Sequence, residues 1–326
     1  MRILVTGATG FVGGQLAAEL VRRGHAVRVL RRASSSLIAL EGLEVEHVIG
    51  DILEPAAVAR AVTGCERVFH VAAVSTYLRS TKEQLYRVNV EGTRIVMAAC
   101  LQAGVPRVVH TSSAAAIGIR RDGVAANEET PFDAFSASWA YADSKHRAEA
   151  EVQRAVAAGL QAVIVNPAAV VGPGDHYLVA SAGIELARRQ PLLVPPGGLC
   201  VVDVAAVVAG HLAAAERGRV GERYILGGEN LTTMQLMAII AEITGLRPPR
   251  GALPRWVLGP AAGAVDIFNR LSGRPPMISG EQLRLAALSV YYDSSKAVAE
   301  LDYPMLPIRP AAEQAYWWYL EHGYLK

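Results

Sequence analysis

The sequence predicts a doubly wound α/β fold, in which a parallel sheet is covered by helices on both faces. Through the first half of the chain, short β-branched runs alternate with stretches of helical spacing. A glycine-rich turn directly follows the first of these runs and opens the first helix. After residue 167 this alternation is broken by glycine and proline, which predicts a smaller and mostly helical C-terminal part.

Six apolar runs are the predicted strands of the first half, at residues 3–5, 26–30, 45–49, 67–71, 107–110 and 161–165. Between them the spacing is helical, as at Leu16, Leu20 and Val21, where Gly24 suits the end of a helix. Repeated strand–helix–strand units form a parallel sheet with right-handed crossovers. In such sheets the ligand binds at the carboxyl ends of the strands.

The glycine turn spans residues 6–13 and reads TGATGFVG. Gly7 permits a tight turn, Gly10 lets the backbone approach a pyrophosphate, and Gly13 lets helix and strand pack closely. The following helix offers unpaired N–H groups and its positive dipole end to the phosphates. A strand before the motif and a helix after it favour a dinucleotide site of the Rossmann type over a merely structural turn.

The end of the second strand indicates which dinucleotide binds. An acidic residue there holds the ribose 2′-hydroxyl of NAD, whereas arginine accommodates the 2′-phosphate of NADP. Here Arg31 and Arg32 are followed by alanine and three serines, with no acidic residue nearby. The sequence therefore favours NADP(H), with NAD(H) as the alternative cofactor and solvated loop arginines as the alternative interpretation.

The second half contains one predicted strand, at residues 223–226, and helices that are divided by prolines. We expect an NAD(P)-binding Rossmann domain over residues 1–170, to which residues 199–228 return. Residues 171–198 and 229–326 would then form the substrate-binding domain.

Composition excludes several classes of function. The 326 residues carry 32 basic and 30 acidic side chains, a net charge of +2, so we expect no nucleic-acid partner. The apolar fraction of 52% supports a sizeable core. The chain has an odd number of cysteines without metal-binding spacing, so we expect no disulfide framework, no metal site and a reducing compartment: Cys65, Cys100 and Cys200.

The sequence shows no membrane span and no signal peptide. The apolar stretch at the N-terminus ends after three residues. The most membrane-like tract, residues 201–215, contains Asp203 and His211 and is shorter than the ~20 residues that a bilayer requires. We therefore expect a cytoplasmic protein without a membrane partner.

Tyr141 and Lys145 begin a predicted helix and share one of its faces, because they are four residues apart. A fixed positive charge ~4 Å from the phenol is worth about 4 kcal/mol at an effective dielectric of ~20, which would lower the tyrosine pKa from ~10. The phenol could then exchange a proton with a carbonyl or alcohol oxygen. The same spacing also occurs on ordinary helix surfaces. Here, however, Thr111, Ser112 and Ser113 follow the strand at 107–110, and a hydroxyl there could bond the same oxygen.

With these motifs in this order, the chain resembles the extended short-chain dehydrogenase/reductases over nearly its whole length. The resemblance implies Tyr141 as acid/base, Ser113 as the group that positions the reacting oxygen, and Lys145 as the ligand of the nicotinamide ribose. It also implies Asn89 as a catalytic residue, which either supports Lys145 through a water or caps a helix. The cofactor-binding residues would be Gly7, Thr9, Gly10, Phe11, Val12, Gly13, Arg31, Arg32, Asp51, Ile52, Val71, Ala72, Ala73, Ser75, Lys145, Pro167 and Val170.

Within that group the chain is most similar to dihydroflavonol 4-reductase-like proteins and hopanoid-associated sugar epimerases, through residues 27–32, 89–93 and 224–231. Ser113 is followed by three alanines and not by the acidic residues of family dehydratases. For an epimerase, Arg188, Arg189 and Arg223 are available to hold a pyrophosphate, although each could also have an ordinary surface role. We expect an NADP(H)-dependent carbonyl reductase or alcohol dehydrogenase, with a redox-neutral nucleotide-sugar epimerase as the alternative. An intact set of catalytic residues disfavours an idle nucleotide-sensing scaffold.

The substrate is expected to be a small, aromatic or apolar molecule. Its candidate contacts are Thr76, Tyr77, Trp139 and Tyr177, where the aromatic rings could stack against a ring or chain. Each of these aromatic residues could also be a packing residue. The cluster at residues 317–319 is assigned to the core or an interface. The family resemblance further suggests a homodimer formed through the helices near residues 85–102 and 141–157.

Overall fold

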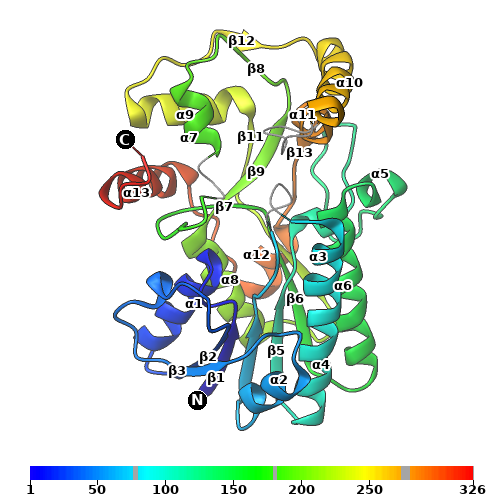
Figure 1. Ribbon diagram of the computed structural model, residues 1–326, viewed down its shortest axis with the longest axis vertical. Coiled ribbons are helices and arrows are strands. Elements are labelled where there is room, and N and C mark those ends of the chain that lie inside the picture. The colour runs from blue at the N-terminus through cyan, green and yellow to red at the C-terminus, as the bar shows by residue number, and fades with distance from the viewer. Residues whose placement is uncertain (76–79, 179–181, 273–279, 326) are drawn as a thin grey trace.

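A computed structural model of the chain describes residues 1–75, 80–178, 182–272 and 280–325. A large sheet with flanking helices forms one end of the molecule, and smaller sheets with further helices form the other end (Figure 1). The chain begins in the large sheet, and its last helix, α13 (Ile308–Glu321), lies in the other part of the molecule.

The large sheet has seven strands in the order β10-β6-β5-β4-β1-β2-β3, and all of its neighbouring pairs are parallel. The predicted doubly wound parallel sheet is therefore confirmed. The bounds of its strands are β1 (Arg2–Thr6), β2 (Ala26–Arg31), β3 (Glu46–Ile49), β4 (Arg67–His70), β5 (Arg107–Thr111), β6 (Ala162–Pro167) and β10 (Arg223–Leu226).

Helices cover both faces of this sheet. Alternate strand residues point to opposite faces and are apolar on both, so each face packs against its own set of helices. Ile3 and Val5 of β1 join one apolar cluster with α1 (Phe11–Arg22) and α8 (Val204–Arg217). Leu4 of the same strand joins the cluster on the other face. The helices of that second face are α2 (Pro55–Val62), α4 (Gly92–Gln102) and α6 (Ala140–Ala157).

Short helical segments connect these elements. They are η1 (Ile38–Leu40), α3 (Lys82–Tyr86), the π-helical η2 (Arg87–Glu91), η3 (Ala114–Ala116) and α5 (Ala134–Ala137). The helices of the second half are α7 (Ala182–Arg188), α9 (Thr233–Thr244), α10 (Arg255–Ser272), α11 (Gly280–Ala286), α12 (Ser295–Leu301) and α13 (Ile308–Glu321).

The second half contains more strands than the single one predicted after residue 167, so that prediction was wrong. A four-stranded sheet is formed by β7 (Ala169–Val171), β9 (Gly198–Asp203), β11 (Glu229–Thr232) and β13 (Ser289–Val290), and a two-stranded one by β8 (Leu193–Val194) and β12 (Gly251–Ala252). These strands have two to six residues. Runs this short carry too few alternating positions to be distinguished from loops. The domain boundaries expected from the sequence stay a prediction.

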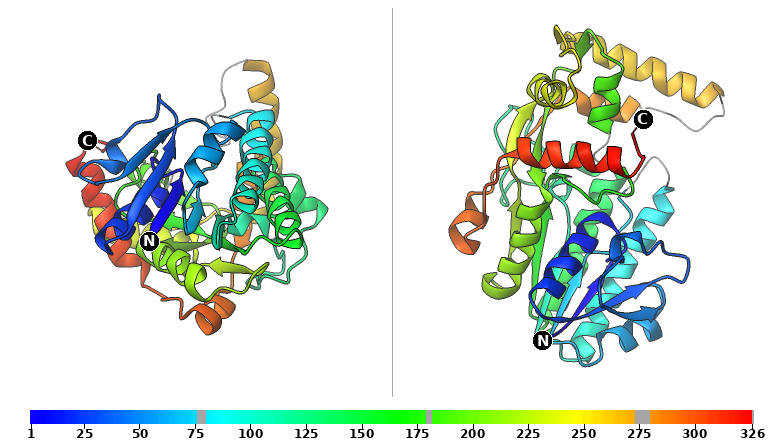
Figure 2. Two further views of the ribbon diagram at one scale, coloured as in Figure 1. Left: turned by 90° about the horizontal axis from the view of Figure 1, so that it is seen from below. Right: turned by 90° about the vertical axis from the view of Figure 1, so that its left-hand side faces the viewer.

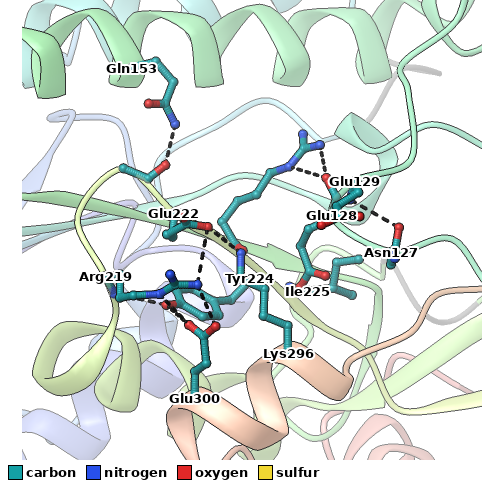
Figure 3. Close-up of polar contacts among 12 residues, drawn as sticks. Asn127, Glu128, Glu129, Gln153, Arg219, Glu222, Tyr224, Ile225, Lys296 and Glu300 are labelled. Carbon is teal, nitrogen blue, oxygen red and sulfur yellow. Dashed lines mark hydrogen bonds and ion pairs between the residues drawn. The ribbon is translucent and has the colours of Figure 1, made fainter.

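Strand β10 is held at the edge of the large sheet by side chains of α12, as Figure 3 shows. Lys296 donates to Glu222 at 2.6 Å and to the carbonyl of Arg223 at 2.9 Å. The buried phenol of Tyr224 donates to Glu300 at 2.7 Å. These contacts attach a late segment of the chain to the first sheet.

None of the helices in the described ranges is long and apolar enough to cross a membrane. The apolar tract at 201–215 consists of the end of β9 and most of α8, whose residues pack against the large sheet. Among the described residues, no group of three or more His, Cys, Asp or Glu side chains could hold a metal ion. Cys65, Cys100 and Cys200 are buried free thiols.

Candidate active site

The glycine turn after β1 has no room for side chains at two of its positions. Gly7 has φ +76°, and a Cβ there would lie 2.6 Å from the Ala72 nitrogen. A Cβ at Gly13 would lie 2.2 Å from the Gly7 carbonyl oxygen, and Gly10 N donates to that same oxygen at 2.9 Å. Only glycine therefore lets β1, the start of α1 and the end of β4 approach so closely.

The start of α1 fits the phosphates of a dinucleotide. Gly10 is the N-cap and has no side chain to accept from the first-turn N–H groups, and the first turn carries no acidic residue. These N–H groups and the positive end of the helix dipole therefore remain available for an anion. Thr9, Phe11 and Val12 lie half-buried in this turn.

The two arginines at the end of β2 have different surroundings. Arg31 is half-buried, and its Nε donates to His47 Nδ1 at 3.0 Å. Arg32 is exposed, and its guanidinium has no hydrogen bond or ion pair within the described ranges. Arg32 is thus the better placed of the two to meet a ligand phosphate.

Asp51 and Ile52, two of the predicted cofactor-binding residues, follow β3. The Asp51 carboxylate accepts from Leu53 N at 3.0 Å, which fixes the turn. Ile52 is buried under α4, where a Cβ at Gly92 would lie 2.7 Å from the Ile52 Cδ1. Asp51 and the glycine turn both lie at the carboxyl edge of the sheet, since each follows a parallel strand.

The segment after β4 runs beside the glycine turn. The Thr6 hydroxyl oxygen accepts from Ala72 N at 3.3 Å, and Val71 N donates to the Thr6 carbonyl at 3.2 Å. Val71 and Ala72 are half-buried, while Ala73 and Ser75 are exposed. On the opposite side of the same edge, Pro167 ends β6 and Val170 lies in β7.

Ser113, Tyr141 and Lys145 come from two adjacent elements at the carboxyl edge of the sheet. Ser113 follows β5, and its Oγ accepts from Ala115 N at 3.2 Å, so the hydroxyl proton can still be donated. Tyr141 is half-buried in the first turn of α6. Lys145, one turn further, is 2% exposed, and its Nζ donates to the Thr111 carbonyl at 2.7 Å.

Burial and a neighbouring carboxylate act in opposite directions on the pKa of Lys145. Burial lowers its pKa from 10.5 to about 8, and the Glu149 carboxylate acts in the opposite direction. Glu149 lies four residues after Lys145 and so shares its helix face. Its charge therefore helps to keep the lysine protonated near neutral pH.

Asn89 joins the segment after β4 to helix α6. Its Oδ1 accepts from Val74 N at 2.8 Å, and its Nδ2 donates to Val74 O at 3.1 Å and to Ser144 Oγ at 3.0 Å. Ser144 in turn donates to the carbonyl of Tyr141 at 2.7 Å. These bonds differ from the expected helix cap and hold the backbone of Val74 and the first turn of α6 in place. A water-mediated link to Lys145 stays a prediction.

Sequence reasoning missed the role of Glu149. This carboxylate is 5% exposed and accepts from Ser112 Oγ at 2.5 Å and from Asn166 Nδ2 at 2.6 Å. Asn166 Nδ2 also donates to the Ser113 carbonyl at 2.9 Å. Its spacing of four residues from Lys145 placed it on the same helix face, but no local pattern indicated its partners on β6 and β10.

Arg223 completes this cluster. Its guanidinium lies 3.3 Å from Glu149 Oε2, and it donates to the Glu128 carbonyl. The sequence offered Arg223 as a free ligand for a pyrophosphate, but these contacts already occupy it. That expectation is therefore corrected.

Three histidines are buried beneath the site, and burial lowers their pKa values. The pKa of His70 falls to about 3, that of His211 to about 4, and that of His110 well below its ordinary 6.5, with the Lys145 charge adding to the effect at His70 and His110. His70 accepts from Thr6 and donates to Thr93, whose hydroxyl donates to the Asn89 carbonyl. Neither ring nitrogen of His110 has a partner among the described residues.

Acid is therefore expected to destabilise the fold. The unfolded chain takes up protons on these histidines below about pH 6.5, while the folded chain does not, so the stability present above pH 6.5 is lost as the pH falls. Each histidine contributes about 1.4 kcal/mol per pH unit until its folded pKa is reached.

Replacement of His110 by leucine is expected to preserve stability at pH 7 and to weaken this loss by about 2 kcal/mol between pH 7 and pH 5. Urea unfolding at both pH values measures the effect. His70→Leu is the matched control and should lose stability at pH 7, because it leaves the Thr6 and Thr93 hydroxyls without their partner. An unchanged pH slope for His110→Leu would contradict the explanation.

The structure describes only two of the four predicted substrate residues. Thr76 and Tyr77 lie outside the described residues. Trp139 is half-buried directly before α6, with its ring 5.9 Å from that of Phe135, and Tyr177 is 53% exposed. Residues 317–319, which were predicted to lie in the core or an interface, differ in burial. Trp317 is 53% exposed, whereas Tyr319 is buried and donates to Asp175 at 2.7 Å.

Comparison with known proteins agrees with this architecture. The model of the NAD-dependent epimerase/dehydratase family matches residues 3–227. A protein of Synechocystis sp. provisionally named dihydroflavonol 4-reductase is 39% identical over 99% of this chain and 95% of its own. Sterol demethylase protein B of Methylococcus capsulatus is 36% identical over 99% of both chains.

Two further similarities bear on function. A 4-hydroxy-2-methyl-3-oxo-4-farnesyl-3,4-dihydroquinoline-1-oxide ketoreductase of Stigmatella aurantiaca is 30% identical over 93% of this chain and 92% of its own. The crystal structure of a nucleoside-diphosphate-sugar epimerase from Pseudomonas aeruginosa superposes with a TM-score of 0.82 at 27% identity, covering 100% of this chain and 99% of that one.

A seven-stranded parallel sheet with a tight glycine turn after its first strand defines a Rossmann-like α/β protein. The chain belongs to the NAD-dependent epimerase/dehydratase family. It is accordingly an NAD(P)-dependent enzyme of the oxidoreductase or epimerase type.

Proposed function

We propose that this protein is an NADP(H)-dependent carbonyl reductase or alcohol dehydrogenase with an apolar, ring-containing substrate. The observation that carries the proposal is the arrangement of Ser113, Tyr141 and Lys145. They lie at the carboxyl edge of the sheet, with the Lys145 Nζ fixed to the end of β5 and its pKa near 8. The glycine turn lies at the same edge.

In the proposed reaction the nicotinamide supplies or accepts the hydride. Tyr141 donates a proton to the carbonyl oxygen as the hydride reaches the carbon, and takes it back from the alcohol in the reverse direction. The Ser113 hydroxyl donates to the same oxygen and orients it. The Lys145 charge stabilises the phenolate that Tyr141 becomes when it has given up its proton.

The surroundings of Ser113 favour reduction over dehydration and epimerisation. Ser113 is followed by Ala114–Ala116 in η3, so no carboxylate lies next to it in the sequence to remove a substrate proton. Arg223 is occupied by Glu128 and Glu149 and is not free to hold a sugar pyrophosphate. The named relatives with sterol and farnesyl-quinoline substrates support an apolar substrate.

A redox-neutral nucleotide-sugar epimerase is the second candidate, because a solved epimerase shares 27% identity and nearly the whole chain. The two candidates differ in cofactor consumption. We expect loss of NADPH absorbance in proportion to product with a panel of cyclic and isoprenoid ketones. Turnover of a nucleotide sugar without NADPH consumption would overturn the reductase proposal.

Arg32 is proposed to bind the 2′-phosphate of NADP. Arg32→Asp is expected to weaken NADPH binding by roughly 10- to 100-fold, the range of one or two charge-assisted hydrogen bonds, with little effect on NADH. Fluorescence titration with each cofactor measures this. Arg60→Asp, at an exposed arginine in the last turn of α2, controls for the change in net charge. Equal weakening of both cofactors would contradict the assignment.

We further propose a homodimer formed through helices near residues 85–102 and 141–157, and a cytoplasmic location. Within one chain, Ile95 and Met97 of α4 are already buried, so a dimer contact would use the outer positions Arg94 and Ala98. Sedimentation velocity measures the mass of the particle directly.

A further inference from the structure

Helix α10 presents an apolar face that the described residues leave uncovered. Its exposed positions recur at helical spacing and are almost all without polar groups: Arg255, Trp256, Gly259, Pro260, Ala264, Ile267, Phe268 and Leu271. The large side chains among them are strongly exposed, Trp256 to 78%, Ile267 to 61%, Phe268 to 70% and Leu271 to 82%. A contiguous apolar surface of this kind is uncommon on a soluble monomer and marks an interaction site.

The other sides of α10 are occupied. Leu258 and Ala262 are 3% and 0% exposed. Asp266 accepts from Gly280 N and from Arg284, each at 2.9 Å, and so fastens the helix to α11. The helix is therefore held from its inner side, and in the right-hand view of Figure 2 it projects outward from the body of the molecule.

The segment that leads into α10 and the first half of the helix carry charges of one sign only. From residue 247 to residue 265 the sequence contains no acidic residue, and it contains three exposed arginines, Arg247, Arg250 and Arg255. The next acidic residue, Asp266, is paired with Arg284. An apolar face with arginines and a tryptophan at its beginning has the composition of a helix that lies in the headgroup region of an anionic membrane.

A second copy of the chain fits this face less well. The sequence of α10 carries arginine near both of its ends, Arg255 and Arg270. Two such helices packed parallel and face to face would bring the exposed Arg255 side chains of the two copies together. Anionic phospholipids instead provide both an apolar layer and negative charge within the reach of these side chains.

We propose that α10 docks the protein on the surface of an anionic lipid bilayer. The helix lies in the plane of the interface, with Trp256, Phe268 and Leu271 among the acyl chains and Arg247, Arg250 and Arg255 at the phosphates. This goes beyond the function proposed above, with which it is compatible because an apolar substrate accumulates in the bilayer. It departs from the expectation of no membrane partner, which rested on the length of the apolar tract at 201–215.

Vesicle flotation of the full chain tests the proposal. We expect the protein to float with vesicles of phosphatidylglycerol and phosphatidylcholine and to bind vesicles of phosphatidylcholine alone at least tenfold more weakly. The variant Ile267→Gln/Phe268→Gln/Leu271→Gln should lose binding at least tenfold. The matched control Ile49→Gln/Val298→Gln/Met305→Gln removes three exposed apolar residues elsewhere and should bind like the wild type.

Other outcomes overturn the proposal. It is wrong if the wild type stays with the soluble fraction, or if the α10 and control variants bind equally. It is also wrong if the α10 variant converts a dimer into a monomer in sedimentation velocity, since the face would then be an interface between copies. NADPH consumption with a water-soluble ketone is measured in parallel, so that failure of the proposed reductase activity is seen separately from failure of membrane binding.

Discussion

Replacement of Tyr141 by phenylalanine is expected to lower kcat roughly 10²- to 10⁴-fold, the contribution of general acid–base catalysis by a positioned side chain. The ring would keep its place in the first turn of α6, while the carbonyl oxygen would lose its proton donor. The affinity for NADPH should remain almost unchanged, because the glycine turn and Arg32 lie on other elements.

Single-turnover kinetics with NADPH and fluorescence titration of the cofactor measure the two quantities separately. Tyr224→Phe is a suitable control, since the phenol of Tyr224 donates to Glu300 of α12 and contacts no part of the candidate site. We expect that control to retain kcat and to lose some stability. Full activity of Tyr141→Phe would assign the proton to another group and remove the central element of the proposed mechanism.

The parts of the site that could be predicted from the sequence are local. Gly7 and Gly13 act within one turn, and their lack of a side chain is required by contacts with the next few residues or the neighbouring strand. Tyr141 and Lys145 are placed on one face by helix geometry alone. The strands of the large sheet were predictable for the same reason, because each contains a short apolar run that alternates with stretches of helical spacing.

The parts that could not be predicted depend on several distant segments. The Glu149 cluster joins residues after β5, in α6, at the end of β6 and in β10. No local sequence pattern indicates that Glu149 of α6 will accept a hydrogen bond from Asn166, seventeen residues further along the chain. The exposed face of α10 is a further example, because its apolar residues alone would equally fit a buried helix.

Glu149→Ala is expected to lower the free energy of unfolding by roughly 3 kcal/mol, the cost of breaking a buried ion pair by removal of one partner. The loss would leave Ser112 Oγ without its acceptor. Arg223 would keep only the Glu128 carbonyl, and Asn166 Nδ2 only the Ser113 carbonyl. Arg223 is one quarter exposed, so water can solvate part of its charge and the cost falls at the lower end of the 3–5 kcal/mol range.

The same substitution should also change the pH dependence of the reaction. Glu149 raises the pKa of Lys145 against the effect of burial, so its removal moves that pKa further below about 8 and leaves less ammonium at neutral pH. We expect kcat to decline at a lower pH than in the wild type, a shift that a purely structural role would not produce. Glu91→Ala, which breaks the exposed pair with Arg94, is the control and should cost no more than about 0.5 kcal/mol. If the variant loses stability but its pH profile is unshifted, Lys145 keeps its proton without Glu149. The role of Glu149 would then be limited to holding the strand ends together.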